Sequence, residues 1–158
     1  MRESHTAREF HTTSDEETIE LGRRLARLLP RPALVLLVGN LGAGKTTLAK
    51  GIVSGLGAAA PEEVASPTFT LIHEYGSAAA RNLVYHVDLY RLDRAAEVAT
   101  LGLDEILDRD AVVLIEWGER FRELLPEPNV EIHLTAAGDD PNARRITITG
   151  ELSSAFPT

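Results

Sequence analysis

The sequence predicts an α/β protein of three layers, in which helices cover both faces of a mixed, mostly parallel central sheet. Two apolar runs, residues 33–38 and 111–116, contain almost no polar side chains, as strands covered on both faces require. Segments with helical periodicity follow these runs. Two pairs of β-rich segments are each separated by turn residues, which predicts antiparallel hairpins beside the parallel strands.

The first predicted helix spans about residues 15–29. Ser14 stands at its start and Glu17 follows three residues later, which is the spacing of a capping box. Apolar side chains then recur at helical spacing and form the expected inward face, at Leu21, Leu25 and Leu28.

The strand at 33–38 leads directly into Gly39-x-x-x-x-Gly44-Lys45-Thr46, and a helix follows. This is the P-loop pattern in the context that it needs. Its glycines let backbone N–H groups surround a β-phosphate, Lys45 supplies positive charge to the β- and γ-phosphates, and the Thr46 hydroxyl can bind Mg²⁺. The sequence therefore predicts a P-loop NTPase fold. The expected nucleotide-binding residues are Gly39, Asn40, Leu41, Gly42, Ala43, Gly44, Lys45, Thr46 and Thr47.

The remaining elements follow in a regular order. The pattern predicts a hairpin of strands at 68–75 and 83–88, helical residues at 94–107, a strand at 111–116, a short helix at 117–125, and a terminal hairpin of strands at 130–135 and 144–149. Gly102 is expected to divide the helical segment into two pieces.

Two carboxylates stand where predicted strands end, Asp88 and Glu116. Parallel strands would deliver both side chains to the phosphates, where a P-loop hydrolase needs a carboxylate to hold its metal. The alternative is that either residue caps the next helix or pairs with an arginine. Two residues near these carboxylates also have more than one possible role. His86 suits a proton shuttle or a hydrogen-bonded, partly buried position. Trp117 could cover the nucleotide or a partner, or it could pack in the core.

Composition limits the possible functions. The 158 residues suit one domain, 1–158, with 1–13 and 151–158 as flexible tails. A net charge of −8 argues against a general grip on nucleic acid, including DNA. The absence of cysteine excludes disulfides and thiolate metal sites. The apolar runs are too short to span a bilayer, so we expect a cytoplasmic protein without membrane contact.

Several motifs occur together in a specific order. They are Gly39-Asn-Leu-Gly-Ala-Gly-Lys-Thr-Thr47, Ser66-Pro-Thr-Phe-Thr-Leu71, Tyr85-His-Val-Asp-Leu-Tyr-Arg91, Ile115-Glu-Trp117 and Glu131-Ile-His-Leu134. Over about residues 14–135 the chain resembles the bacterial TsaE (YjeE) ATPases of the tRNA threonylcarbamoyladenosine pathway. The Asp-Leu-Tyr-Arg and Glu-Trp blocks are more specific than the P-loop itself.

The resemblance implies that ATP and Mg²⁺ are the cofactors and that hydrolysis is slow in the isolated protein. It implies partners, the TsaD and TsaB proteins, which transfer threonylcarbamoyl to adenosine 37 of tRNAs that read ANN codons. These partners would stimulate turnover, and tRNA would be met only through the complex. A negatively charged accessory ATPase that does not itself hold tRNA fits this expectation.

The resemblance also implies roles for single residues. Lys45, Asp88 and Glu116 would form the catalytic set, with Thr46 and Glu116 as the Mg²⁺ ligands. Asp15 would contact the nucleotide, and Thr68 would belong to a segment that senses the γ-phosphate. The family usually has Asp where this chain has Asn40. Because that loop position contributes mainly backbone, we expect binding to survive the change.

Two other functions stay open for a P-loop protein of this size, namely a small-molecule kinase and a nucleotide-gated binding module without catalysis. The sequence lacks the arginine-rich lid insertion that many kinases use. A guanine-reading Asn-Lys-x-Asp segment is excluded, because the only lysines, Lys45 and Lys50, flank the P-loop. No Ser-Gly-Gly signature of ABC ATPases is present.

Overall fold

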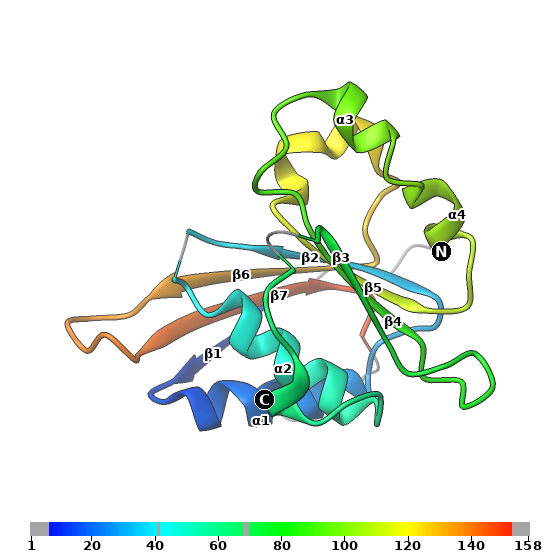
Figure 1. Ribbon diagram of the computed structural model, residues 1–158. Coiled ribbons are helices and arrows are strands. Elements are labelled where there is room, and N and C mark those ends of the chain that lie inside the picture. Colours follow the sequence, from blue (N-terminus) through cyan, green and yellow to red (C-terminus); the bar gives the residue numbers. More distant parts are fainter. Residues whose placement is uncertain (1–6, 41, 68–69, 153–158) are drawn as a thin grey trace, which may run out of the picture.

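A computed structural model describes residues 7–40, 42–67 and 70–152 of the chain (Figure 1). The elements in chain order are β1 (Arg8–Thr12), α1 (Asp15–Ala26), β2 (Ala33–Val38), α2 (Lys45–Gly55), the 3₁₀ helix η1 (Pro61–Glu63), β3 (Ile72–Tyr75), β4 (Val84–Asp88), α3 (Ala95–Ala99), α4 (Leu103–Leu107), β5 (Val112–Glu116), the 3₁₀ helix η2 (Gly118–Leu124), β6 (Val130–Ala136) and β7 (Arg144–Gly150).

The strands form one mixed sheet in the order β1-β7-β6-β2-β5-β4-β3. The four central strands, β6, β2, β5 and β4, run parallel, and antiparallel strands extend the sheet at both edges. In this register Asp88 stands beside Glu116, and Glu116 stands beside Leu37 near the end of β2. The carboxyl ends of β2, β5 and β4 therefore meet at one edge, which is where α/β sheets bind ligands.

Helices cover both faces of the sheet, which gives the three expected layers (Figure 1). Alternate side chains of β2 supply the two cores, as a strand buried on both sides must. Val35 and Leu37 pack with α1 and α2. Leu34 and Leu36 pack with residues of α3, α4 and η2 on the opposite face.

Helices α1 and α2 lie in very close contact, and glycines make this contact possible. A Cβ atom at Gly51 would stand 2.1 Å from the carbonyl oxygen of Ile19. A Cβ atom at Gly22 would stand 2.6 Å from the carbonyl oxygen of Leu48. Any side chain at either position would push the helices apart. This packing fixes α2, and with it the loop that precedes α2.

The expected flexible tail at residues 1–13 is wrong over residues 8–12, which form strand β1. This strand pairs antiparallel with β7, Arg8 beside Ile148 and Thr12 beside Arg144. Its alternating pattern is short and mostly polar, and the partner edge lies far along the chain, so local sequence did not reveal it. At the other end, residues 151–152 are described, and the Glu151 amide donates to the Asn129 carbonyl at 2.8 Å. Residues 153–158 lie outside the described part.

The other elements agree with the predicted order, with shifts at their ends. The Ser14 hydroxyl caps α1 by accepting from the Glu17 amide at 3.1 Å, while the Glu17 carboxylate accepts from the Thr13 amide. This helix ends at Ala26 rather than near residue 29. Gly102, with φ of +75°, separates α3 from α4 as expected. Strand β3 begins at Ile72, and residues 68–69 of its predicted segment are outside the description.

Candidate nucleotide-binding site

The glycine-rich loop, residues 39–46, joins the end of β2 to the start of α2. Gly42 and Gly44 adopt φ angles of +79° and +100°, a region that favours glycine. Gly44 occupies the N-cap of α2 and has no side chain to bond the first amides of the helix. These amides, together with the positive end of the helix dipole, are suited to bind an anion.

Lys45 is almost completely buried within this loop, with 4% of its surface exposed. Its Nζ donates to the carbonyl oxygen of Gly39 at 2.6 Å and lies 3.6 Å from the centre of the Trp117 ring. Burial lowers the pKa of Lys45, and the negative charges of Glu116, Glu119 and Asp88 oppose that effect. The ammonium is thus held in place by a carbonyl and a ring face, both of which a phosphate group could replace.

Glu116, at the end of β5, connects the loop to the neighbouring strand. Its Oε2 accepts a hydrogen bond from the Thr46 hydroxyl at 3.2 Å and lies 2.6 Å from Nε2 of His86. His86 is fully buried on β4. The buried Nδ1 of the same ring has no hydrogen-bond partner among the described residues. The imidazole therefore holds the carboxylate against Thr46.

Asp88, at the end of β4, is also buried and lies beside the same opening. Its Oδ2 accepts from the Ser66 hydroxyl at 3.3 Å, and its Oδ1 accepts from the Tyr90 amide at 2.9 Å. The second bond shapes the turn that follows β4. Asp88 and Glu116, the two acidic strand ends, both line the cavity beside the glycine-rich loop.

Trp117 follows Glu116 with a φ of +66°, an unusual conformation for a residue with a side chain. The sharp turn after β5 sets the indole beside the Lys45 ammonium, and the Tyr90 ring packs against the indole with 5.0 Å between centroids. Trp117 also contacts the core on the α3–α4 face. The ring is thus partly packed against the core and also lines the site, and its role as a cover for a nucleotide or a partner stays a prediction.

These residues surround a cavity of about 410 Å³, here called the carboxylate cavity. It is lined by Asp15, Gly42, Gly44, Lys45, Thr46, Thr47, Ser66, Asp88, Tyr90, Glu116, Trp117, Asn142 and Arg144. The structure thus brings together most of the residues that the sequence singled out, including Asp15 from the start of α1.

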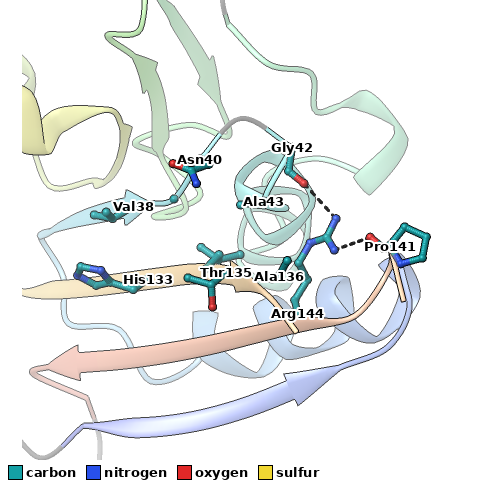
Figure 2. Close-up of a pocket in the computed structure, with 11 residues that line it drawn as sticks. Val38, Asn40, Gly42, Ala43, His133, Thr135, Ala136, Pro141 and Arg144 are labelled. Atoms are coloured by element: carbon teal, nitrogen blue, oxygen red, sulfur yellow. Dashed lines mark hydrogen bonds between the residues drawn. The ribbon is translucent and has the colours of Figure 1, made fainter. Parts of the chain in front are cut away.

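A second cavity of about 420 Å³, here called the hairpin cavity, opens on the other side of the glycine-rich loop (Figure 2). It is lined by Val38, Gly39, Asn40, Gly42, Ala43, His133, Leu134, Thr135, Ala136, Pro141 and Arg144. No carboxylate is among these described residues. Two residues, Gly42 and Arg144, line both cavities, so the two spaces adjoin.

The oxygen donors at the carboxylate cavity fit a magnesium ion. Neighbouring ligands of octahedral Mg²⁺ lie about 2.9 Å apart, given Mg–O distances of about 2.0–2.1 Å. The 3.2 Å between Thr46 Oγ1 and Glu116 Oε2 is close to that separation. Within the described ranges, no group of three or more His, Asp or Glu side chains is placed to hold a metal. The site thus resembles those in which Mg²⁺ takes one or two protein ligands and completes its shell with water and phosphate.

Sequence reasoning missed several residues of the two cavities. Arg144 and Asn142 come from the terminal hairpin, more than 90 residues after the glycine-rich loop, and no local pattern marks them. The segment from His133 to Ala136 belongs to β6. The sequence predicted a strand as far as residue 135 and a family motif as far as Leu134, but it gave this segment no role in a site. Two expected site residues, Leu41 and Thr68, lie outside the described residues.

Comparison with known proteins decides the family. The model of the family described as "Threonylcarbamoyl adenosine biosynthesis protein TsaE" matches residues 12–146. That range covers most of the 158 residues. The chain belongs to the TsaE family. The expected family membership is thereby confirmed, and the match extends through β6 to the start of β7.

Individual TsaE relatives match along most of their length. The tRNA threonylcarbamoyladenosine biosynthesis protein TsaE of Bacillus subtilis is 39% identical over 140 residues, covering 89% of this chain and 84% of that protein. The protein of the same name from Streptomyces coelicolor is 43% identical over 134 residues, covering 83% and 88%. The crystal structure of Bacillus subtilis YdiB matches with a TM-score of 0.73 at 33% identity and covers 98% of this chain and 92% of that one.

These comparisons confirm the expected fold, a three-layer P-loop NTPase architecture with a mixed sheet whose centre is parallel. They also connect the chain with the biosynthesis of tRNA threonylcarbamoyladenosine through the family to which it belongs. In the described part of the chain, no helix has both the length and the apolar character needed to cross a membrane.

Proposed function

We propose that this protein binds ATP with Mg²⁺ and hydrolyses it slowly, in support of the threonylcarbamoylation of tRNA adenosine 37. The observation that supports the proposal most directly is the convergence of Lys45, Thr46, Asp88 and Glu116 on one cavity at the carboxyl ends of β2, β4 and β5. This set contains a cation for the phosphates, two oxygen ligands for a metal and a second buried carboxylate.

Each residue of the set has a distinct task. The loop amides and Lys45 would bind the β- and γ-phosphates, and the ammonium would leave the Gly39 carbonyl to do so. Thr46 and Glu116 would hold Mg²⁺, which neutralises charge that develops on the phosphate oxygens. Asp88 lies beside this position with one oxygen bonded by Ser66, and it would accept a hydrogen bond from the attacking water and orient it.

The two adjoining cavities suit the two halves of a nucleotide. The carboxylate cavity contains the phosphate-binding groups, so the nucleoside would occupy the hairpin cavity beside Asn40 and Thr135. Asp15 would contact the nucleotide from the first turn of α1. Asn40 is exposed and lines the hairpin cavity, so its side chain is free to differ from that of relatives without affecting the loop amides.

The net negative charge of this chain is best explained if the protein acts in a complex with TsaB and TsaD. With a net charge of −8, this chain is poorly suited to hold tRNA by its phosphates. The partners would bind the tRNA and perform the transfer, while this protein supplies a nucleotide-dependent step. The expected place of action is the cytoplasm.

ATP hydrolysis by the purified chain, measured with and without the TsaB–TsaD pair, tests the proposal. We expect slow Mg²⁺-dependent release of phosphate that rises when both partners are added, and binding of ATP in preference to GTP. Phosphoryl transfer to a metabolite without stimulation by the partners would instead indicate a kinase. Binding without turnover under either condition would indicate a nucleotide-gated binding module.

A further inference from the structure

Arg120, in the 3₁₀ helix η2 that follows β5, holds the turn that follows β4. Its Nη1 donates to the carbonyl oxygen of Tyr90 and its Nη2 donates to that of Leu92, each at 2.8 Å. The same Nη2 lies 3.5 Å from a carboxylate oxygen of Asp93, whose side chain is 86% exposed. An ion pair with so exposed a partner contributes little. The two hydrogen bonds to carbonyls therefore carry most of the interaction.

The turn held in this way begins at Asp88, the buried carboxylate at the end of β4. The amide of Tyr90 donates to Asp88 Oδ1 at 2.9 Å, while the carbonyl of the same residue accepts from Arg120. The Leu89 amide donates to the carbonyl of Glu116 at 3.0 Å, so the start of the turn is tied to β5. Tyr90 thus links the guanidinium of Arg120 to the carboxylate of Asp88.

The segment that carries Arg120 is itself held in place. The backbone amide of Arg120 donates to the carbonyl of Trp117 at 3.4 Å, and the next residue, Phe121, is buried. Gly118 packs so closely that a Cβ atom built there would stand 2.9 Å from Cδ2 of Leu36. These contacts fix the backbone from which the guanidinium extends.

The two acceptors suit an arginine. The carbonyls of Tyr90 and Leu92 are two positions apart, and a planar guanidinium offers a separate nitrogen to each of them at the same time. A lysine has one ammonium on a flexible chain and lacks this fork. A hydrogen bond from a charged donor is also stronger than one from a neutral donor.

We propose that Arg120 is a positioning residue for ATP hydrolysis. By holding the turn after β4, it keeps the Tyr90 amide on Asp88 and so fixes the carboxylate that would orient the attacking water. This inference rests on the proposed hydrolysis of ATP. Arg120 is not among the described residues that line the carboxylate cavity, so its effect passes through Asp88. Lys45 and Thr46 are not part of this connection, so the affinity for nucleotide should stay as it is.

Two substitutions serve as matched controls. Arg122, in the same helix, donates to Glu131, and its side chain is 47% exposed. Arg122→Gln therefore removes the same charge from η2 as Arg120→Gln does, without affecting the turn. Asp93→Asn removes the ion pair of Arg120 and leaves its two carbonyl acceptors in place.

The test measures turnover and affinity separately in the full chain. Phosphate release from saturating radiolabelled Mg-ATP gives kcat, and calorimetric titration with Mg-ADP gives Kd. We expect Arg120→Gln to lower kcat by about 10- to 100-fold, as displacement of a catalytic group does, and to leave Kd unchanged. Both controls should behave as the wild type. Wild-type kcat in Arg120→Gln, an equal fall in either control, or a loss of affinity as large as the loss of rate would overturn the proposal.

A double substitution shows whether Arg120 acts through Asp88. If Arg120 only positions this carboxylate, then adding Arg120→Gln to Asp88→Asn should cause little further loss of rate, whereas two independent effects would multiply. A further loss as large as that caused by Arg120→Gln in the otherwise unchanged chain would overturn the proposal.

Two further measurements keep the test decisive. Thermal unfolding shows whether Arg120→Gln folds, and if it does not, Arg120→Lys replaces it, because lysine keeps the charge and lacks the fork. A lowered kcat of Arg120→Lys with unchanged Kd would support the proposal, and a wild-type kcat would overturn it. A wild-type chain that binds ATP without hydrolysing it, alone or with the TsaB–TsaD pair, would contradict the proposed function instead.

Discussion

The two sides of the glycine-rich loop differ in the residues that they present. On the side of β4 and β5, Asp88 and Glu116 are buried carboxylates, and His86 supports one of them from within the sheet. On the side of β6 and β7, the cavity is lined by neutral groups, an exposed histidine and Arg144, with no carboxylate among the described residues.

This difference indicates that the two sides of the loop have different functions. Buried carboxylates next to a lysine are suited to hold a metal and orient water, and their burial makes each charge strongly felt. The hairpin cavity, which is lined mostly by uncharged groups, is suited to hold the nucleoside. Substitutions on the β4–β5 side should therefore change turnover, whereas those on the β6–β7 side should change affinity alone.

The largest effect should follow a change at the loop itself, which serves both sides. Lys45→Ala removes the buried ammonium and should weaken ATP binding by about 100-fold or more, as loss of one partner of a buried charge pair does. Titration followed by the fluorescence of Trp117, the only tryptophan, would measure it. Lys50→Met is the control, because Nζ of Lys50 instead binds the carbonyls of Pro61 and Val64. Equal losses in the two variants would contradict the assigned role.

Glu116→Ala should act on turnover. Removal of this carboxylate takes away a metal ligand. Loss of a residue that only hydrogen-bonds a metal ligand lowers activity by about 10- to 100-fold, so loss of the ligand itself should lower Mg²⁺-dependent hydrolysis by about 100-fold or more. The measurement is phosphate release across a range of Mg²⁺ concentrations. Glu123→Gln changes an exposed carboxylate close in sequence and should leave the rate unaltered. Normal turnover in Glu116→Ala would refute the metal-ligand assignment.

His86 should act through Glu116 rather than on the nucleotide. His86→Leu removes the hydrogen bond that orients the carboxylate and should raise the Mg²⁺ concentration for half-maximal activity by about tenfold. His86→Gln keeps an N–H donor and should restore most of the loss. The same increase in the required Mg²⁺ concentration should appear when nucleotide binding is measured at a series of Mg²⁺ concentrations. A general loss of stability would not change the Mg²⁺ requirement in this way. An unchanged Mg²⁺ requirement in a folded His86→Leu variant would show that His86 does not position Glu116.

Thr135→Trp tests the opposite side. A large ring at this exposed position would fill part of the hairpin cavity and should weaken ATP and ADP alike by about tenfold, in line with the cost of overfilling a site. The rate at saturating ATP should stay the same, which steady-state kinetics would show. A fall in that rate with unchanged affinity would contradict the expectation that the β6–β7 side affects affinity and not turnover.

The smallest effect concerns stability on the β6 side, where Arg122 donates to Glu131 and Nε2 of His133 lies 3.3 Å from the same carboxylate. The hydrogen bond from Arg122 lowers the pKa of Glu131. A lowered pKa favours the charged carboxylate in the folded state, so its contribution is complete above the ordinary pKa of glutamate and is lost as the pH falls through the lowered value.

Glu131→Gln should therefore cost about 0.5–1 kcal/mol of unfolding free energy at neutral pH, as expected for a partly exposed pair. The difference from the wild type should shrink as the pH is lowered, and denaturant unfolding at several pH values would follow it. A difference that stays constant down to low pH would show that the ion pair is not its source.

Local sequence was sufficient where a feature depends on neighbouring residues. The apolar run of β2, the glycines at 39–44 and the first residues of α2 follow one another, so the loop could be read directly. Asp88 and Glu116 could be found because each ends an apolar strand, and parallel strands end at the same edge. The capping residue Ser14 and the break at Gly102 are likewise properties of a few adjacent residues.

Only the tertiary structure decided the contacts that join distant segments. Strand β1 forms because β7 offers an open edge, and its partner positions lie more than 130 residues away. The hydrogen bond between Arg144 and Gly42 spans 102 positions, and the one between His86 and Glu116 spans 30. The physical reason is that periodicity and turn chemistry act over a few residues, whereas a long-range contact depends on how the whole sheet is ordered and on which side chains then face the same space.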